Sequence, residues 1–489
     1  MTTLRAIIDE LQQRGLLVTA ASDAADINGI TDDSRAVRQG DLYCAWRGTT
    51  RDSHDFLAGA VQNGANAVLV ERAVDGVAVP QVIVKDGRRA AAIAANVVFG
   101  KPAERLVVTG VTGTNGKTTT AWIMRHLLSA RYSAALIGTL GIFLPDGNPL
   151  QAESLTTPGP VELARVLSQL VQRGVTAISM EVSSHALDQG RVHALRFDAA
   201  VFTNLTRDHL DYHGTLEAYL EAKKSFVELL RARGTAIINA DDPAWQGLEQ
   251  RAKRSLRFGI ARDDADVGAE DVDFRADGTR FVLTHGGARA HVDLPLLGDY
   301  NVQNALGAAA ACLSLGYSLD DVAGLLSSVP QVPGRLEKIH TDNFTVLRDY
   351  AHTPDALERV LHTLRDVVTG RIIAVFGAGG DRDKGKRPEM GEIAQRLADV
   401  AIVTSDNPRT ESPEAIIDDI VTGMKAGEYA RIVNRREAIA EALRSARRGD
   451  VVLLAGKGHE TYQIVGSQKL DFDERAIVAE LMANTEVGA

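Results

Sequence analysis

The sequence predicts an α/β protein of three domains, and two observations carry that prediction. Short apolar runs typical of buried strands recur along the 489 residues, and segments with helical periodicity separate them. This alternation is typical of mostly parallel sheets covered by helices. The runs and their glycine loops also restart twice, which divides the chain into residues 1–100, 101–333 and 334–489. The length fits about three domains as well.

The first domain is expected to be a mixed α/β unit, with a helix at 4–16 and strands at 67–70 and 81–84. The central domain has the pattern of a P-loop ATPase-type α/β unit. Its expected strands lie at 106–111, 176–180, 199–202 and 236–238. A polar, acidic stretch at 262–278 should form strands or a surface excursion.

The third domain repeats the alternation and is predicted to be a Rossmann-like, doubly wound α/β unit. Its expected strands lie at 344–347, 371–376, 400–403 and 451–454. Ser412 and Pro413 follow the third of these strands, as an N-cap and a first helical residue would. Residues 404–411 are therefore a strand-to-helix loop, where α/β proteins place ligands.

Bulk composition narrows the function classes. The chain is 45% hydrophobic and 24% charged, and its net charge of -10 argues against general nucleic-acid binding, which needs a basic footprint. No apolar run approaches the roughly 20 residues of a membrane span, and the first residues lack a signal peptide's pattern. Cys44 and Cys312 lie in apolar surroundings far apart in sequence. We expect both to be buried and reduced in a cytoplasmic protein.

The most specific single motif is a phosphate-binding loop, Thr112-Gly-Thr-Asn-Gly-Lys-Thr-Thr-Thr120, between a strand and an amphipathic helix. The strict pattern G-x4-G-K-[ST] fails because its first glycine would fall on Val111. Glycines let backbone N–H groups point at phosphate oxygens, and the helix N-terminus adds its dipole. Lys117 would then meet the β- and γ-phosphates of ATP, and Thr118 would hold Mg²⁺. The expected ATP contacts here are Gly113, Thr114, Asn115, Gly116, Lys117, Thr118 and Thr119.

Two further segments offer metal ligands after neighbouring strands. Glu181 ends the strand 178–181, and the loop 203–214 contains two histidines and two aspartates, His209 among them. Carboxylate and imidazole ligands would suit Mg²⁺ at a phosphoryl-transfer centre, although the residue types would also suit zinc. The alternatives are an ion pair for Glu181 and a loop held only by hydrogen bonds. Lys223 and Lys224 follow in a helix.

These motifs together resemble the Mur ligases, the ATP-dependent amide-forming enzymes of peptidoglycan synthesis. The resemblance extends over nearly the whole chain, and so many motifs in order are far more specific than any one of them. They lie at 33–35, 40–43, 113–119, 180–187, 203–214, 301–304, 333–335, 349–352, 380–387 and 456–460.

The resemblance implies a two-step reaction. ATP phosphorylates the D-glutamyl γ-carboxylate of UDP-N-acetylmuramoyl-L-alanyl-D-glutamate, and the amine of meso-2,6-diaminopimelate then displaces phosphate to form an amide. Lys117, Lys223, Glu181 and His209 would be catalytic. Two Mg²⁺ ions would be held by Thr118, Glu181, His209 and Lys223. Lys223 would act as a carbamate (N6-carboxylysine), with Lys224 as the alternative if the register differs by one.

The same resemblance assigns the remaining substrate contacts. The nucleotide would also meet Asn301, Asn304, Arg335, Asp349 and His352. The UDP end of the other substrate would meet Asp32, Ser34, Thr49, Thr50 and Arg51, and its muramoyl-peptide part would meet Thr156, Thr157, Ser183, Gln189 and Arg191. Leu155 stands where a polar residue is often found, and the residue types at 49–51 vary too freely to check. We further expect a cytoplasmic monomer with small-molecule substrates and no nucleic-acid or membrane partner, serving cell wall biogenesis, cell shape, cell division and the cell cycle.

The stretch Asp406-Asn-Pro-Arg409 predicts which amino acid is added. Alone, Arg409 could be a solvated surface charge. In the family this stretch accompanies members that add meso-diaminopimelate, which resembles lysine but ends in a second carboxylate. A guanidinium grips a carboxylate with two parallel hydrogen bonds, which gives a physical reason for Arg409. The expected diaminopimelate contacts are Arg382, Asp406, Asn407, Pro408, Arg409, Gly456 and Glu460.

Several alternatives stay open from the sequence. The same reaction could use L-lysine, or the chain could be a ligase similar to folylpolyglutamate synthetase, which would lack the domain at 1–100. A P-loop regulator is disfavoured because no Asn-Lys-x-Asp segment for guanine is present. The glycines at 377–380 fail the G-x-G-x-x-G spacing of a dinucleotide site and are read as a loop presenting Arg382. The segment 456–460 could be a plain turn.

Overall fold

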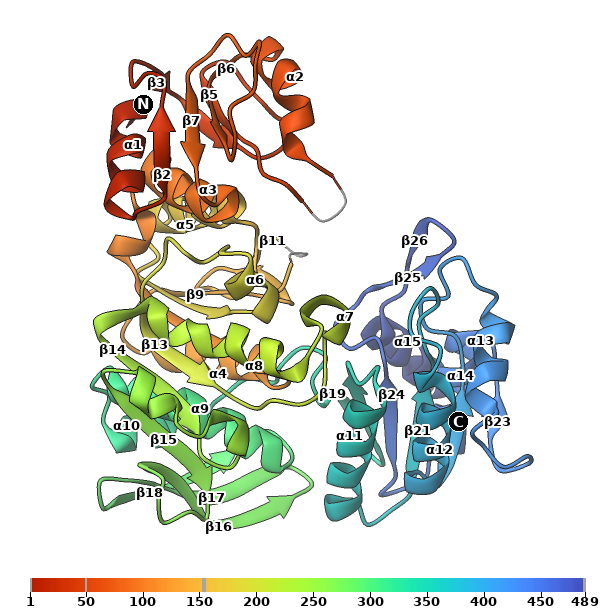
Figure 1. Ribbon diagram of the computed structural model, residues 1–489. Coiled ribbons are helices and arrows are strands. Elements are labelled where there is room, and N and C mark those ends of the chain that lie inside the picture. Colours follow the sequence, from red (N-terminus) through yellow and green to blue (C-terminus); the bar gives the residue numbers. More distant parts are fainter. Residues whose placement is uncertain (1, 49–50, 152–154, 487–489) are drawn as a thin grey trace. The chain divides into compact units, whose positions relative to one another are not determined.

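The structure is a computed structural model that describes residues 2–48, 51–151 and 155–486 (Figure 1). It forms two compact units. One consists of residues 1–270, 283–290 and 303–326, and the other of residues 271–282, 291–302 and 327–489. Each unit is described by itself below.

The N-terminal part of the first unit is a five-stranded sheet in the order β2-β7-β6-β5-β4. Its strands are β2 (Leu17–Ala20), β4 (Gly29–Thr31), β5 (Asp41–Cys44), β6 (Ala65–Val70) and β7 (Gln81–Val84). Only β2 runs antiparallel to its neighbour. The helices α1 (Leu4–Gln13) and α3 (Gly87–Val98) share one apolar core with the sheet, while α2 (Leu57–Gln62) belongs to the core of the other face. This is the mixed α/β unit that the sequence predicts.

An eleven-stranded sheet follows, in the order β11-β10-β9-β12-β8-β13-β14-β15-β16-β17-β18. The strands from β9 to β16 in this order are parallel. They are β8 (Val107–Thr112), β9 (Ala134–Gly138), β12 (Ala177–Glu181), β13 (Phe197–Phe202), β14 (Leu230–Asn239), β15 (Ser255–Ile260) and β16 (Val267–Arg275). The remaining strands are β10 (Gly141–Phe143), β11 (Pro149–Gln151), β17 (Gly278–His285) and β18 (Ala288–Leu294). The acidic stretch at 262–278 therefore contains a strand, one of the two expected outcomes.

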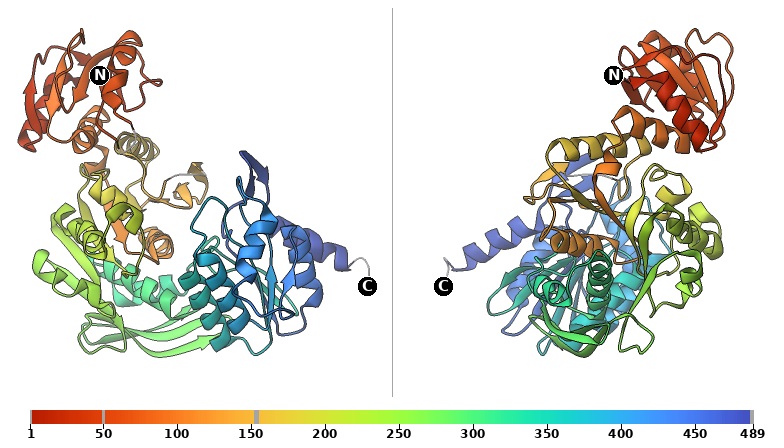
Figure 2. Two further views of the ribbon diagram at one scale, coloured as in Figure 1. Left: turned by 45° about the vertical axis from the view of Figure 1, so that its right-hand side comes forward. Right: turned by 90° about the vertical axis from the view of Figure 1, so that its left-hand side faces the viewer.

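The helices of this region lie between the strands from β8 to β14 and again after β18 (Figures 1 and 2). They are α4 (Lys117–Leu128), α5 (Pro160–Gln172), α6 (Ser184–Asp188), α7 (Leu210–His213), α8 (Leu216–Lys224), α9 (Asp299–Ser314) and α10 (Leu319–Leu326). Because β8 pairs with β12 on one side and β13 on the other, its carboxyl end and the start of α4 lie between the ends of these two strands. That edge is where an open parallel sheet binds ligands.

The second unit contains a six-stranded sheet in the order β19-β20-β24-β21-β22-β23, parallel except at β19. Its strands are β19 (Glu337–Thr341), β20 (Thr345–Asp349), β21 (Ile372–Phe376), β22 (Val400–Val403), β23 (Ala430–Arg431) and β24 (Val451–Ala455). One apolar core joins the sheet to α11 (Pro354–Val367), α12 (Lys386–Leu397) and α13 (Pro413–Val421). A second core, on the other face, joins it to α14 (Arg435–Ser445) and α15 (Glu474–Glu486). The predicted doubly wound α/β unit is confirmed.

Local signals at the loop 404–411 are confirmed as well. The strand β22 has the predicted bounds, and the Ser412 hydroxyl accepts a hydrogen bond from the Ala415 N–H at the start of α13, with Pro413 as the first helical residue. A hairpin of β25 (Tyr462–Val465) and β26 (Gln468–Asp471) lies beside this loop, because the Arg409 N–H donates to the Ile464 carbonyl at 3.0 Å. No expected strand corresponded to this hairpin.

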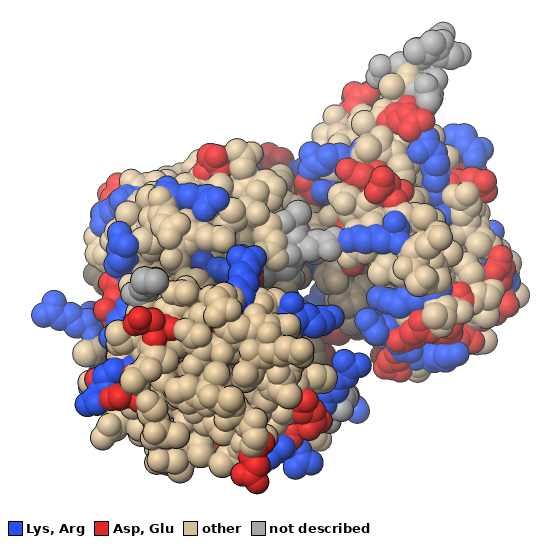
Figure 3. Space-filling model, turned by 90° about the horizontal axis from the view of Figure 1, so that it is seen from above, with Lys and Arg blue, Asp and Glu red and all other residues tan. Residues whose placement is uncertain are grey.

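Burial and surface charge agree with the expectations from composition. Cys44 and Cys312 are buried free thiols, and burial raises the pKa of Cys312 to about 12. Lysine and arginine alternate with aspartate and glutamate over the face shown in Figure 3. Within the described part of the chain, no helix has the length and apolar character needed to cross a membrane.

Candidate active site

The phosphate loop connects β8 to α4 with two glycines in the left-handed region, Gly113 (φ 148°) and Gly116 (φ 84°). A Cβ at Gly113 would overlap the Thr203 hydroxyl, and one at Gly116 would overlap the Asn304 side chain. Both positions therefore need glycine. The Lys117 ammonium lies over the loop, where it donates to the carbonyls of Gly113 (3.0 Å) and Thr114 (2.7 Å). A lysine held there is placed to neutralise phosphate charge.

Glu181, at the carboxyl end of β12, is a buried carboxylate next to the phosphate loop. It accepts hydrogen bonds from the Thr118 hydroxyl (3.1 Å), the Thr139 N–H (2.8 Å) and the Thr139 hydroxyl (3.2 Å). These three donors are neutral groups, so the carboxylate keeps its negative charge through them. Magnesium keeps several waters and takes one or two carboxylates plus phosphate oxygens. Thr118 and Glu181 form a donor set that suits it.

Lys223 is fully buried near the end of α8, whereas its neighbour Lys224 is only half-buried. Its Nζ donates to the Gly113 carbonyl at 2.7 Å and lies 4.5 Å from the centre of the Tyr219 ring. Burial, reinforced by the charge of Lys117, lowers the pKa of Lys223 well below its ordinary value. The structure thus separates the two lysines that the sequence left as alternatives, and it brings Lys223 to the phosphate loop.

His209 begins the short helix α7 and has a left-handed backbone, with φ 52°. Its ring contacts that of His185, with 4.8 Å between centroids, and its Nε2 lies 3.4 Å from Asp208. Burial, with the charges of His209 and His213, lowers the pKa of His185 to about 4. Among the described residues, no group of three or more His, Cys, Asp or Glu side chains is arranged to hold a metal ion. His209 as a metal ligand stays a prediction.

The residues expected around the muramoyl-peptide part form one hydrogen-bonded cluster beside Glu181. The Thr157 hydroxyl donates to the Glu181 carbonyl (2.9 Å) and accepts from the Ser183 N–H (3.1 Å). Arg191 donates to the Thr157 carbonyl (2.9 Å) and to the Gln189 side chain (2.7 and 3.0 Å). The Thr156 and Thr139 hydroxyls are 3.0 Å apart. Residues distant in sequence, Thr156 to Arg191, are thus gathered at the end of β12.

The first-domain residues expected to meet the UDP end are less connected. Asp32 and Ser34 follow the carboxyl end of β4, and the Ser34 carbonyl accepts from Asn63 at 3.1 Å. The Arg51 carbonyl accepts a hydrogen bond from the Gly48 N–H. Thr49 and Thr50 lie outside the described residues. The structure does not bring Asp32, Ser34 and Arg51 together by any hydrogen bond that it describes.

The expected nucleotide contacts divide between the two units. Asn304 on α9 belongs to the first unit, and its Oδ1 accepts from the Thr120 hydroxyl at 3.2 Å. Arg335 and Asp349 belong to the second unit. The Asp349 carboxylate accepts from the N–H groups of Leu336 (2.7 Å) and Ala351 (2.8 Å), and burial raises its pKa.

Two other expected nucleotide contacts also lie in the second unit. Asn301 is buried, and its Nδ2 donates to the Leu297 carbonyl at 2.8 Å. The His352 carbonyl accepts from the Lys386 ammonium at 2.7 Å, and the His352 side chain is exposed. The role of both residues in nucleotide binding stays a prediction.

The expected diaminopimelate contacts converge at the carboxyl edge of the second unit's sheet. Asp406 and Asn407 are buried after β22. The Asn407 amide donates to Glu460 at 2.8 Å, and the Gly380 N–H donates to the Asn407 carbonyl at 2.9 Å. Gly456 has φ 116°, and a Cβ there would overlap Asp406 Oδ2. That oxygen is buried without a hydrogen-bond partner among the described residues, so it is available to a ligand.

Arg409 has a left-handed backbone (φ 51°) and is fixed by the hairpin β25–β26. Its N–H donates to Ile464 and its carbonyl accepts from the Gly466 N–H at 2.7 Å. One guanidinium nitrogen donates to the Gly380 carbonyl at 2.8 Å. A guanidinium has five N–H donors, so most of them remain for a carboxylate. Arg382 is exposed on the neighbouring loop and donates to the Asp381 carbonyl.

Sequence reasoning missed three residues of this edge. Lys457 is fully buried and donates to Asn407 (3.1 Å) and Glu460 (3.3 Å). Gln463 on β25 donates to the Asp406 carbonyl at 2.6 Å. Arg435, at the start of α14, donates to the Ala455 carbonyl at 2.9 Å. Lys457 lies within the motif 456–460, which could have identified it from the sequence. No sequence motif marks Gln463 or Arg435.

Comparisons with known proteins agree with this arrangement. Family models match residues 26–106 (Mur ligase family, catalytic domain), 111–312 (Mur ligase middle domain) and 334–458 (Mur ligase, glutamate ligase domain). Two relatives carry the name UDP-N-acetylmuramoyl-L-alanyl-D-glutamate--2,6-diaminopimelate ligase. The one from Geobacillus kaustophilus is 46% identical, over 92% of this chain and 94% of its own. The one from Gloeobacter violaceus is 44% identical, over 97% and 98%.

A solved structure with the same name superimposes with a TM-score of 0.72 at 34% identity, over 98% of this chain and 99% of its own. The family models, the relatives and this structure all extend over the phosphate loop and the carboxyl edge of the second unit's sheet. The chain belongs to the Mur ligase family.

Proposed function

We propose that the chain is an ATP-dependent ligase that adds meso-2,6-diaminopimelate to the D-glutamyl γ-carboxylate of UDP-N-acetylmuramoyl-L-alanyl-D-glutamate. The names of relatives that cover nearly the whole chain support the reaction class. One observation carries the amino-acid choice: Arg409 lies at the same sheet edge as Asp406, and one buried carboxylate oxygen of Asp406 has no hydrogen-bond partner in the described part of the chain. One end of diaminopimelate presents a carboxylate and an ammonium, which match these two groups.

The chain's own residues would serve the phosphoryl transfer by position and charge. A γ-carboxylate oxygen of the substrate attacks the γ-phosphorus of ATP, and ADP leaves. This transfer needs charge neutralisation more than covalent help from the protein. Lys117 supplies one positive charge at the loop, and the N-terminus of α4 supplies the dipole. Magnesium ions, two in this proposal, would add further charge neutralisation when bound by Thr118, Glu181, His209 and the modified Lys223.

Lys223 is proposed to be the carbamylated residue. Its lowered pKa favours the neutral amine, which is the form that reacts with carbon dioxide. A nitrogen–carbon bond forms, one N–H proton leaves, and the neutral amine becomes an anionic carbamate. A negative group at this position would face Lys117, whose charge now raises the energy of the Lys223 ammonium. The modification would therefore replace repulsion by attraction at the phosphate loop.

In the second step the amine of diaminopimelate attacks the acyl phosphate carbon, phosphate leaves and an amide forms. The second unit would hold the far end of the amino acid through Asp406, Arg409 and Glu460. A site that pairs Arg409 with a carboxylate should reject L-lysine, because the guanidinium would be left without its partner. The proposal also includes a cytoplasmic monomer acting in peptidoglycan synthesis and, through it, in cell shape and the cell cycle.

The test is an amino-acid panel at fixed ATP and fixed UDP-N-acetylmuramoyl-L-alanyl-D-glutamate, scored by ADP release. ADP release that depends on meso-diaminopimelate is the expected result. Release with L-lysine alone would overturn the amino-acid choice but not the reaction class. Release with folate and glutamate, and none with the muramoyl substrate, would overturn the reaction class.

A further inference from the structure

A buried ion pair contacts the two segments that would hold the amino acid, the one after β22 and the one after β24. Arg435 and Glu474 are the first residues of α14 and α15, and both side chains are inaccessible to solvent. The Arg435 Nε donates to Glu474 Oε1 at 2.8 Å. Its two terminal nitrogens donate to the carbonyls of Ala455 (2.9 Å) and Ser405 (3.4 Å).

The two carbonyls belong to segments that are not neighbours in the sheet. Ala455 ends β24 and Ser405 follows β22, and β21 lies between these strands. The guanidinium therefore joins the two segments across the end of β21. The next residue of each segment belongs to the proposed amino-acid site, since Gly456 follows Ala455 and Asp406 follows Ser405.

Those next residues also contact each other. Asp406 Oδ2 occupies the space that a Cβ of Gly456 would need, so the carboxylate packs directly against the glycine backbone. A small change in the separation of the two segments would move this carboxylate oxygen, which is the oxygen that lacks a partner. One rigid, planar guanidinium is among the groups that set this separation; the Asn407 side chain, which contacts Lys457 and Glu460, is another.

Stability of the fold does not account for the ion pair. A buried pair gains little over apolar side chains of similar volume, because both charges lose their hydration. A cation at the first position of a helix also opposes the helix dipole, and Arg435 occupies that position in α14. Glu474 Oε2 is a buried oxygen without a hydrogen-bond partner among the described residues. Burying the pair therefore costs folding free energy, whereas its hydrogen bonds connect the segments that follow β22 and β24.

We propose that Arg435, held by Glu474, is a positioning residue for the amino acid. Together with the contacts of Asn407 to Lys457 and Glu460, it fixes the separation of the segments after β22 and β24 and thereby the location of the Asp406 carboxylate. This inference rests on the proposed function of the Asp406–Arg409 site. Arg435 has no contact with substrate in this proposal and acts only through the two carbonyls.

The test compares two arginine–carboxylate pairs at opposite ends of the same strands. Both members of the Arg435–Glu474 pair are buried, whereas only the acid of the control pair is. The variant is Arg435→Met/Glu474→Met, which removes both charges together and leaves no unpaired buried ion. The control is Arg371→Met/Asp450→Asn. Arg371 donates to Asp450 (2.7 Å) and to the Ser445 carbonyl (2.7 Å) next to the starts of β21 and β24.

We expect the Arg435/Glu474 double variant to fold, with kcat/KM for the amino acid lowered about 10- to 100-fold, since misplacement by about 1 Å can cost about 100-fold. The KM values for ATP and for the muramoyl substrate should stay within about twofold. The control should lower the melting temperature without changing the amino-acid KM. Arg435→Lys keeps a positive charge beside Glu474 but cannot donate to both carbonyls as the planar guanidinium does. It should therefore fold and show the same selective loss of kcat/KM for the amino acid.

Two results would overturn the inference: a folded double variant with an unchanged amino-acid KM, or KM values for all three substrates that rise together. If the double variant does not fold, the same two outcomes decide the matter in Arg435→Lys. The wild type is first assayed with the amino-acid panel, and the variants are assayed with whichever amino acid it uses. A wild type that prefers another amino acid contradicts the proposed function, while the selective loss in the variants still tests the positioning role.

Discussion

Replacing Arg409 by alanine should remove most of the preference for diaminopimelate over lysine. Alanine has the same difficulty with the left-handed backbone as arginine does, so the strain at φ 51° is unchanged. The backbone bonds to the hairpin β25–β26 also remain, because they involve only the main chain. The substitution therefore tests the guanidinium and little else.

The expected size follows from the donors that the structure leaves available. One nitrogen of the guanidinium already donates to the Gly380 carbonyl, so a carboxylate can take a fork of two other N–H groups. Hydrogen bonds to charged groups contribute about 1.5–3 kcal/mol each. Because Arg409 is half-buried, we take the lower end, about 3 kcal/mol for two bonds. That corresponds to about a 100-fold loss in kcat/KM.

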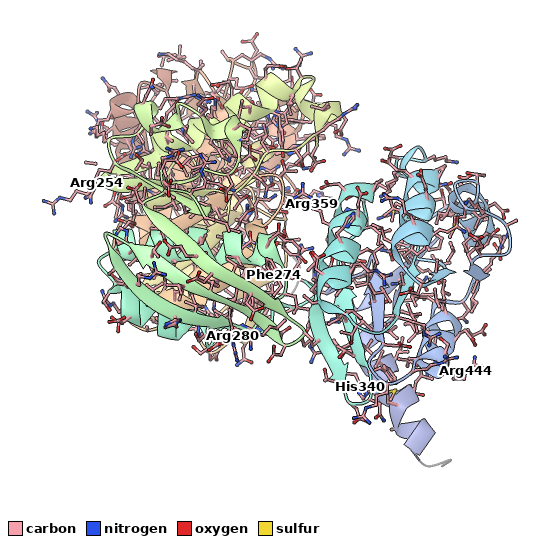
Figure 4. The ribbon with its side chains drawn as sticks, turned by 90° about the horizontal axis from the view of Figure 1, so that it is seen from below. Arg254, Phe274, Arg280, His340, Arg359 and Arg444 are labelled. Carbon is pink, nitrogen blue, oxygen red and sulfur yellow. The ribbon has the colours of Figure 1, made fainter. Side chains whose placement is uncertain are left out.

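The assay measures kcat/KM for meso-diaminopimelate and for L-lysine from ADP release, together with ATP affinity by calorimetry. Arg409→Ala should lose about 100-fold with diaminopimelate only, and Arg409→Lys should lose about tenfold because one charged bond survives. Arg444→Ala is the matched control. Arg444 lies on α14 (Figure 4), is exposed and pairs with Glu441 at 2.7 Å. Equal losses with both amino acids, or a loss of ATP binding, would refute the role of Arg409.

Three further predictions concern the first unit. Lys223→Ala should lower ADP release at least about 100-fold with an unchanged melting temperature, whereas Lys224→Ala should stay active; the reverse pattern would identify Lys224 as the functional lysine. Gly113→Ala should abolish ATP binding in calorimetry, because the new Cβ would overlap Thr203, and normal affinity would mean that the loop can shift. Burial lowers the pKa of His193 to about 4, so the unfolded chain binds more protons between about pH 6.5 and pH 4, and stability should fall as the pH drops through that window. His193→Gln should flatten this slope in urea unfolding, and parallel pH profiles would contradict the prediction.

Local patterns predicted the parts of the fold that depend on neighbours in sequence. The run Val400–Val403 is fully apolar and forms β22 with the predicted bounds, and Ser412 caps α13 because its hydroxyl reaches an N–H three residues on. The phosphate loop was predicted for the same reason. Glycine at 113 and 116 and the following Lys-Thr-Thr define a strand–loop–helix unit within one short segment.

Features that depend on distant partners were not predictable in the same way. Nothing near Lys223 in the sequence distinguishes it from Lys224; the distinction arises because the loop at Gly113 is folded against one of them. The hairpin β25–β26 lacks a strong alternating pattern and is placed by its bonds to Arg409. Arg435 lies in a charged stretch, and its burial becomes intelligible only with Glu474, 39 residues away.

The second unit contains several arginines, and they differ in how many of their N–H donors are already hydrogen-bonded within the protein. This difference, which the sequence does not show, indicates which arginine can bind the amino acid. Arg387 is fully buried, and its terminal nitrogens are occupied by Glu411, Asp419 and the Gly379 carbonyl. Its charge is balanced by two acids, so it can hold a loop but cannot attract an anion. Arg435 is likewise occupied by an acid and two carbonyls. The bond that the structure gives Arg409 is to a single carbonyl. Hydrogen bonds from Thr410, together with the nearby charge of Arg409, lower the pKa of Asp381, so Arg409 has one acid near it. That acid takes its hydrogen bonds from Thr410, and the spare donors of Arg409 can pair with a ligand carboxylate. This is why Arg409, and neither of the buried arginines, should set the choice of amino acid.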